Sequence, residues 1–214
     1  MIIKRAALAA LVASAGLLAV PAPALAAPPT PEQLESALLV PEDFGFDFGY
    51  NETHNREVLS AGYSKSKGCK AALKALTPLF RAKTATWISR NERPEGVKEV
   101  ILAGKPKQID ALEAAAKVMS RECRGTIDNG ASKRSFQRLS VGKLGDAVYA
   151  FRFISRIPEI SSEVSMGEDV VVIRRGDTLI GLTHNGFFGS FQPSLTQKAA
   201  RLAATRLDEV LATG

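Results

Sequence analysis

The chain has 214 residues, 45% of them hydrophobic, and a formal net charge of +6. Its length and its aliphatic content fit one domain with a substantial core. The basic residues are scattered, without a long run and without interleaved aromatic residues, so we expect no nucleic-acid partner. A weak preference for anionic envelope polymers or lipid headgroups is compatible with this charge, as is a simple solvated surface.

The first 26 residues predict a signal peptide. Lys4 and Arg5 form a basic start, residues 6–20 are apolar, and Ala24-Leu25-Ala26 offers the small residues of a cleavage site. The apolar stretch is short for a bilayer span, no second stretch of about 20 residues follows, and no cysteine at the cleavage point could accept a lipid. We therefore expect a secreted protein without a stable membrane anchor after signal cleavage, with residues 27–214 as a single domain.

The segment after the leader predicts little regular structure. Residues 27–31 are rich in proline, and Pro31 suits the start of a short helix that Pro41 ends. Residues 43–49 repeat Asp-Phe-Gly, which favours an irregular turn with the rings packed inward, and residues 56–63 can form a strand.

Two longer helices are expected in the middle of the chain, separated by strands at 84–90 and 97–103. The first begins near Gly68 and the second at Pro106, and Gly125 caps the second. Their apolar stripes consist of Cys69, Ala72, Leu73, Leu76 and Phe80 in the first helix and Ile109, Leu112, Ala116, Met119 and Cys123 in the second.

The two cysteines, Cys69 and Cys123, are expected to form a structural disulfide. An exported protein meets oxidising surroundings, and closing this loop would stabilise the fold by about 4 kcal/mol in the loop-entropy model. A redox pair would normally use Cys-x-x-Cys spacing, and a metal site would need more ligands than two thiols. The bond would pin the two helices together over a shared sheet.

The C-terminal part predicts mostly strands and one final helix. The strands are expected at residues 133–139, 147–155, 169–175 and 178–184, and Gly176-Asp177 between the last two favours a tight hairpin. A Gly- and Phe-rich loop at 185–191 leads to a helix that begins at Pro193. This pattern belongs to the α/β (α+β) class.

Ser64-Lys65-Ser66-Lys67 matches the Ser-x-x-Lys pattern of penicillin-recognising enzymes. That chemistry needs the serine at a helix start with the lysine one turn on, but the helix here is expected to start after Lys67. The accompanying Ser-Asp-Asn and Lys-Thr-Gly elements are absent, so a solvated loop is the favoured interpretation.

The two histidines occupy identical tripeptides, around His54 and His184, but no third metal ligand is indicated by spacing. We expect no metal and no cofactor. The better candidate for ligand binding is the end of the last strand and the loop after it, where the side chains could line a cleft or simply fill the core. The candidate residues are His184, Asn185, Phe187, Phe188 and Phe191.

In order and spacing, these features resemble the PknH-like extracellular sensor domain, an actinobacterial family found as receptor-kinase ectodomains and as exported proteins. The resemblance runs from about Gln33 to Leu211. It rests on Leu38-Leu39 and Pro41 after a short helix, a helix starting at Cys69, a helix ending at Cys123, Gly145-Asp146 before a strand, and the hairpin from Val170 to Gly181.

The resemblance implies a twisted, largely antiparallel sheet with helices packed on one side, a cleft, and binding of an unidentified extracellular ligand without enzymatic activity. This sequence departs from the receptor by having no kinase, no transmembrane segment and a single cysteine pair. A soluble binding relative fits these departures, with a small molecule, a lipid or an envelope component as its partner. The alternatives are a cell-wall- or lipid-acting serine hydrolase that uses Ser64 or His184, and a protein-interaction module.

Overall fold

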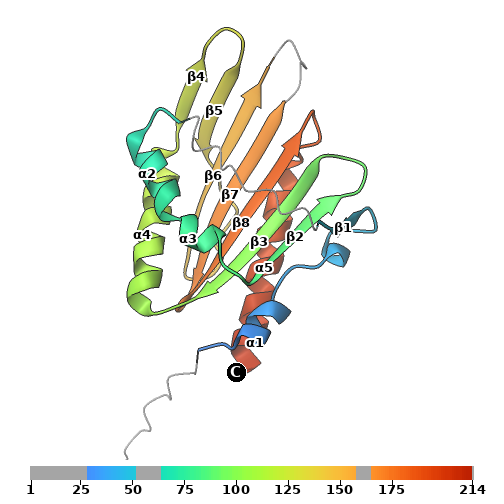
Figure 1. Ribbon diagram of the computed structural model, residues 1–214, viewed down its shortest axis with the longest axis vertical. Coiled ribbons are helices and arrows are strands. Elements are labelled where there is room, and N and C mark those ends of the chain that lie inside the picture. The colour runs from blue at the N-terminus through green and yellow to red at the C-terminus, as the bar shows by residue number, and fades with distance from the viewer. Residues whose placement is uncertain (1–27, 52–63, 158–164, 214) are drawn as a thin grey trace, which may run out of the picture.

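The computed structural model describes residues 28–51, 64–157 and 165–213, which build one antiparallel sheet flanked by helices (Figure 1). The eight strands follow the order β1-β2-β3-β8-β7-β6-β5-β4. They are β1 (Phe48–Tyr50), β2 (Ala85–Arg90), β3 (Glu95–Ala103), β4 (Gly125–Asp128), β5 (Lys133–Arg138), β6 (Ala147–Arg156), β7 (Met166–Arg175) and β8 (Thr178–Phe187). The expected mixed α/β class and antiparallel sheet are confirmed.

Helices cover both faces of this sheet, whereas the resemblance implied helices on one side. In Figure 1, α5 passes behind the sheet and α3 lies in front of it. The helices are α1 (Pro31–Ser36), a short 3₁₀ turn η1 (Pro41–Asp43), α2 (Lys67–Ala75), α3 (Thr77–Phe80), α4 (Pro106–Glu122) and α5 (Pro193–Thr213). Among the described residues, no helix combines the length and the apolar character that crossing a membrane requires.

The two faces have separate cores because successive side chains of a strand point to opposite sides. On β7, Val171 and Ile173 pack with α5 and α1, while Val170 and Val172 pack with α2, α3 and α4. Gly181 of β8 allows α3 to approach the sheet closely. Because both faces are covered, β7 and β8 are buried along most of their length.

The expected disulfide is present between Cys69 of α2 and Cys123, the residue after α4. The two Cα atoms lie 4.8 Å apart and both side chains are fully buried. Each cysteine lies on the apolar stripe of its helix, so the bond joins α2 and α4 above the same face of the sheet.

Most expected elements occur within a few residues of their predicted bounds, with four differences. The chain between Gly68 and Phe80 forms two helices: α2 ends at Ala75, Leu76 lies between them, and Pro78 is in the first turn of α3. The structure also adds β4, forms β1 within the expected turn, and extends β8 into the expected loop. The predicted strand at 56–63 lies outside the described residues.

Candidate functional site

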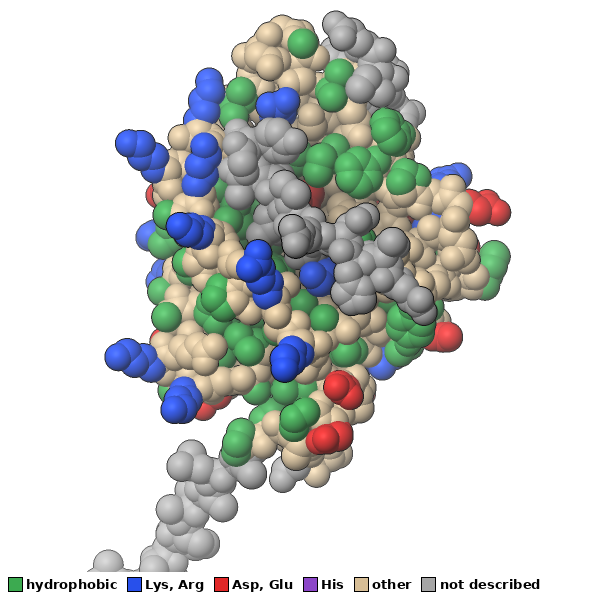
Figure 2. All heavy atoms as spheres, in the orientation of Figure 1, with side chains coloured by type: hydrophobic (Ala, Val, Ile, Leu, Met, Phe, Trp, Pro, Cys, Tyr) green, Lys and Arg blue, Asp and Glu red, His purple; other side chains and the backbone are tan. Residues whose placement is uncertain are grey.

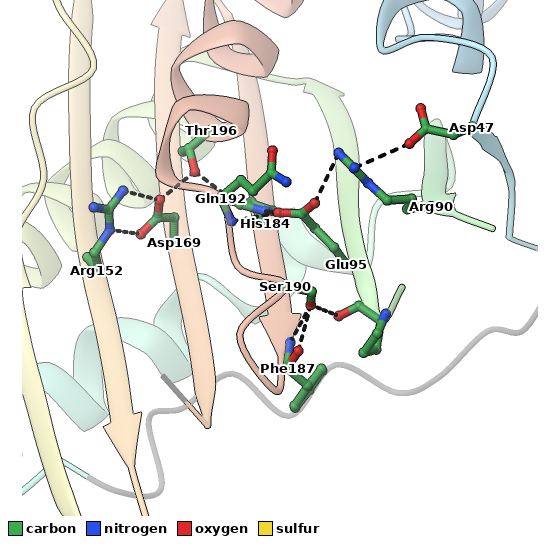
Figure 3. Close-up of polar contacts among 11 residues, drawn as sticks. Asp47, Arg90, Glu95, Arg152, Asp169, His184, Phe187, Ser190, Gln192 and Thr196 are labelled. Atoms are coloured by element: carbon green, nitrogen blue, oxygen red, sulfur yellow. Dashed lines mark hydrogen bonds and ion pairs between the residues drawn. The ribbon is translucent and has the colours of Figure 1, made fainter. Parts of the chain in front are cut away.

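A row of polar side chains crosses the sheet beneath α5. Arg152 of β6, Asp169 of β7 and His184 of β8 occupy neighbouring positions in the strand register, so their side chains project from the same face. Asp169 and His184 are almost completely buried, and the Arg152 side chain is 15% exposed. Figure 3 shows the row together with its continuation toward β1.

Hydrogen bonds join these three residues through Thr196 in the first turn of α5. Arg152 donates two bonds of 2.7 Å to the two carboxylate oxygens of Asp169, and the Thr196 hydroxyl donates to Asp169 Oδ2. Because the hydroxyl proton is used on the carboxylate, the Thr196 oxygen accepts from Nδ1 of His184, at 2.7 Å. The start of α5 is thus attached to the sheet.

The other half of the row runs from His184 to the edge of the sheet (Figure 3). Nε2 of His184 lies 3.2 Å from Oε1 of Glu95, which also accepts the backbone N–H of Gln192 at 2.6 Å. Arg90 lies 3.3 Å from the other oxygen of Glu95 and 3.2 Å from Asp47. The row therefore links β6 to the segment before β1.

Phe191 covers this row. Its ring stacks on the His184 ring, with centroids 4.7 Å apart and planes 15° apart, and the Arg152 guanidinium lies 5.3 Å from the ring centre. The ring rests on Gly167, and the Phe191 backbone rests on Gly186, which pairs with Gly167 across β7 and β8. A Cβ atom at Gly167 would lie 2.3 Å from the ring, so only glycine accommodates Phe191 at this position.

A chain of contacts runs from the Thr196 hydroxyl to the His184 imidazole and on to the Glu95 carboxylate. This is the order of groups in a nucleophilic triad. A working triad passes the hydroxyl proton to the imidazole, whereas here the hydroxyl donates to Asp169. All three side chains are buried, with Thr196 2% exposed. In the described structure these groups bind one another, and the arrangement fixes α5 on the sheet.

A second buried carboxyl, Glu99 of β3, lies on the same face near α1. Its Oε2 accepts the backbone N–H of Leu39 at 2.7 Å, and its Oε1 has no hydrogen-bond partner among the described residues. Burial raises the pKa of Glu99 from its ordinary 4.5 to about 8, although the Leu39 bond and the charge of Arg206 act in the opposite direction. Arg206 of α5 pairs with Asp43 at 2.7 Å.

The structure separates the candidate ligand residues into two groups. His184 and Phe191 are buried in the row beneath α5. Asn185 and Phe187 alternate with His184 along β8 and therefore project from the opposite face, where both are partly exposed. Phe188 follows them in the turn and is 67% exposed. No single surface contains all five residues.

The turn that carries Phe188 is held rigidly. Phe188 is the one described residue other than glycine with a positive φ, at 52°. Its N–H donates to Ser165 O at 3.1 Å, and the N–H of Phe187 donates to Pro94 O at 3.0 Å. The Ser190 hydroxyl accepts from the Phe187 N–H at 3.1 Å and lies 2.6 Å from the oxygen of the same residue. These bonds present an exposed ring on a fixed backbone.

The other sequence candidates are less suited to chemistry. Ser64 is buried and its hydroxyl accepts the N–H of Ser66, while Lys67 is the first residue of α2. Ser64 thus precedes the helix, and the lysine is not one helical turn beyond a serine at the helix start. His54 lies outside the described residues. Within the described part of the chain, no group of three His, Cys, Asp or Glu residues could hold a metal ion.

The sequence interpretation missed the partners of His184. A signal was available, because Asp169 and Glu99 are acidic residues at core-facing positions of apolar strands. A buried charge needs a partner, so each indicates a polar cluster inside the fold. The identity of the partners, Arg152, Thr196 and Glu95, depends on strand register and on the placement of α5.

No protein-family model matches the chain, and no curated protein matches it either. A search of solved structures finds the extracellular domain of PknH from Mycobacterium tuberculosis, with a TM-score of 0.52 over 86% of this chain and 98% of that chain, at 13% identity. An uncharacterised protein from Rhizobium leguminosarum matches with a TM-score of 0.18 and 9% identity, over 57% of this chain and 66% of that one. The chain therefore has a fold similar to that of the PknH extracellular domain.

Proposed function

We propose that this chain is a secreted, PknH-like sensor domain that binds an extracellular or envelope ligand and has no catalytic role. The observation that carries the proposal is the fold shared with an extracellular domain over nearly the whole length of that domain. The export signal expected from the first 26 residues supports the same location. The hydroxyl, imidazole and carboxylate groups beneath α5 are buried and bond to one another, which argues against catalysis at these groups.

The ligand contacts the turn after β8, on the side of Phe188. An exposed phenylalanine in the left-handed region is unusual, and such backbone conformations occur often at ligand-binding positions. Phe187 lies beside it, with ring centroids 6.4 Å apart, and Asn185 adds an amide on the strand below. The two rings offer an apolar surface and the amide offers hydrogen bonds, a combination that suits a small molecule, a lipid or a glycan.

His184 and Phe191 have a supporting role in this proposal. Phe191 stacks on His184 within the same short segment that forms the turn, and Ser190 next to it bonds the turn to Phe187 and Pro94. The buried row thus holds the end of β8 while the outward side chains remain available to a ligand.

A thermal-shift screen with envelope glycans, lipids and small metabolites tests this function. A ligand should raise the melting temperature of the wild type, and Phe188→Ala should remove most of that increase. Phe46→Ala is the matched control, since Phe46 is 101% exposed and lies in the turn before β1. No response to any compound from a folded protein, or an equal loss in both variants, would contradict the proposal.

A further inference from the structure

The segment from Ser64 to Asn91 contains no acidic residue. It forms α2, α3 and β2 and carries six exposed basic side chains, which we call the basic surface: Lys65, Lys67, Lys70, Lys74, Arg81 and Lys83. Among the described residues none of these six forms an ion pair. The fold therefore exposes a local excess of positive charge at this segment, although the basic residues of the whole sequence are scattered.

The geometry of α2 produces this concentration. Lys67, Lys70 and Lys74 recur at three- and four-residue spacing, so they form a row along one side of the helix. The opposite side carries the buried Cys69 and Leu73, which attach α2 to α4 and the sheet. In Figure 2, Lys and Arg side chains (blue) gather over the half of the molecule where α2, α3 and α4 lie. The prominent Asp and Glu side chains (red) lie at the opposite edge and near α1.

Several arginines elsewhere in the fold have acidic partners. Arg174 pairs with Asp110 and Glu113 of α4, and Arg175 pairs with Asp146 and Asp208. On α2, in contrast, like charges at i, i+3 and i, i+4 repel one another, and Lys65 and Lys67 lie at the helix N-terminus, where positive charge is unfavourable. Glu122 lies beside the start of α2, where its carboxylate accepts from the Ser66 hydroxyl at 3.4 Å, but in the described structure no carboxylate pairs with any of the six basic side chains.

We propose that the basic surface binds a linear anionic polysaccharide. A polyanion supplies the compensating charge, and the row from Lys67 to Lys74 is about 10 Å long, enough to contact successive anionic groups of an extended polymer. Five of the six residues are lysines, whose flexible ammonium groups act as point charges and can contact the anionic groups of a polymer without a fixed bidentate geometry.

Other anionic partners fit this surface less well. A membrane-surface helix presents large apolar side chains beside its charges, but the exposed large hydrophobic residues of the described structure, Phe46, Tyr50 and Phe188, all lie outside α2 and α3. A single-stranded nucleic acid would use exposed aromatic rings for stacking, and the exposed large rings of the described structure lie outside the segment that carries the basic surface. The inference goes beyond the proposed sensor function and does not depend on the Phe188 turn.

Binding of the purified, disulfide-bonded protein to polygalacturonate, measured at several salt concentrations, tests the proposal. We expect salt-sensitive binding, and about a tenfold or larger loss of affinity at low salt for Lys70→Glu/Lys74→Glu. The control is Lys143→Glu/Arg201→Glu, which changes the net charge equally at exposed residues outside the basic surface. The control and Phe188→Ala should bind almost as the wild type does, and thermal melting shows that each variant is folded.

Three results would overturn the proposal. The first is an equal loss of affinity in the two charge-reversal variants, because net charge and not this surface would then account for binding. The second is tighter binding to phosphatidylglycerol vesicles or to single-stranded DNA than to the polysaccharide. The third is a failure of the wild type to bind polygalacturonate more tightly than neutral dextran at low salt. Each leaves the ligand response at Phe188 unaffected, so the two proposals can fail separately.

Discussion

The helices on the two faces of the sheet are attached in different ways. On one face, α2 and α4 are joined by a disulfide and pack through apolar side chains such as Leu73 and Met119. On the other face, α5 has an apolar stripe too, but its first turn is attached through Thr196 to a buried polar row. Glu99 adds a second buried polar contact near α1.

This difference determines which conditions change the stability of each face. A disulfide restricts the unfolded chain and has no charge, so the contact between α2 and α4 depends on redox conditions and little on pH. The ion pairs of α4 with Arg174 on this face are partly exposed. Buried carboxyl groups and their partners depend on ionisation and on each partner being present. The face of α5 should therefore be sensitive to pH and to single polar substitutions, and it is the face that supports the turn of Phe188.

The largest effect should follow loss of the disulfide. Cys69→Ala/Cys123→Ala should lower the free energy of unfolding by about 4 kcal/mol, because the cross-link no longer restricts the unfolded chain. Chemical denaturation of the variant and of the wild type, each with and without reductant, measures this difference. Reductant should destabilise only the wild type. A loss below about 1 kcal/mol would show that apolar packing alone holds α2 on α4, and the comparison of the two faces would then fail.

A smaller and pH-dependent effect is expected at Glu99. Its pKa of about 8 in the folded protein lies above the ordinary 4.5, so the folded state binds this proton more tightly than the unfolded state does. The contribution to stability is complete below pH 4.5 and is lost as the pH rises through 8. Relative to Glu99→Gln, the wild type should lose about 3 kcal/mol between pH 5 and pH 8.

Denaturant unfolding of the two proteins across this pH range measures the Glu99 contribution. Asp146→Asn is a suitable control, since Asp146 is a half-exposed carboxyl in a surface ion pair and its pKa is lowered mainly by the Gly176 N–H. Parallel pH profiles for the wild type and Glu99→Gln would show that Glu99 is ionised in the folded protein. The face of α5 would then be less sensitive to pH than we infer.

The sequence predicts the apolar part of both faces. The stripes of the helices around Cys69 and Cys123 have helical periodicity, and Gly176-Asp177 between two apolar runs specifies a hairpin. These are local patterns, each confined to one element or one turn. The disulfide was predictable because the chain has only two cysteines and an expected export signal.

The polar row was not predictable in the same way, because its contacts join residues far apart in the sequence. Glu95 and His184 meet through the pairing of β3 with β8, and Thr196 reaches both His184 and Asp169 only when α5 crosses that face. The alternation of side chains along β8 also explains why the candidate ligand residues lie on two different faces of the sheet. A one-residue step reverses the face, so His184 is buried while Asn185 points the other way.

The smallest effect, and the most specific to the face of α5, should follow loss of one hydroxyl. Thr196→Val keeps the shape of the side chain but leaves Nδ1 of His184 without an acceptor and Asp169 without one donor, so stability should fall by about 2 kcal/mol. Thr178→Val is the matched control, because Thr178 is also buried but its hydroxyl bonds to no other described residue. The control should change stability by less than about 0.5 kcal/mol. Equal effects in chemical denaturation would mean that apolar packing, and not the polar row, attaches α5 to the sheet.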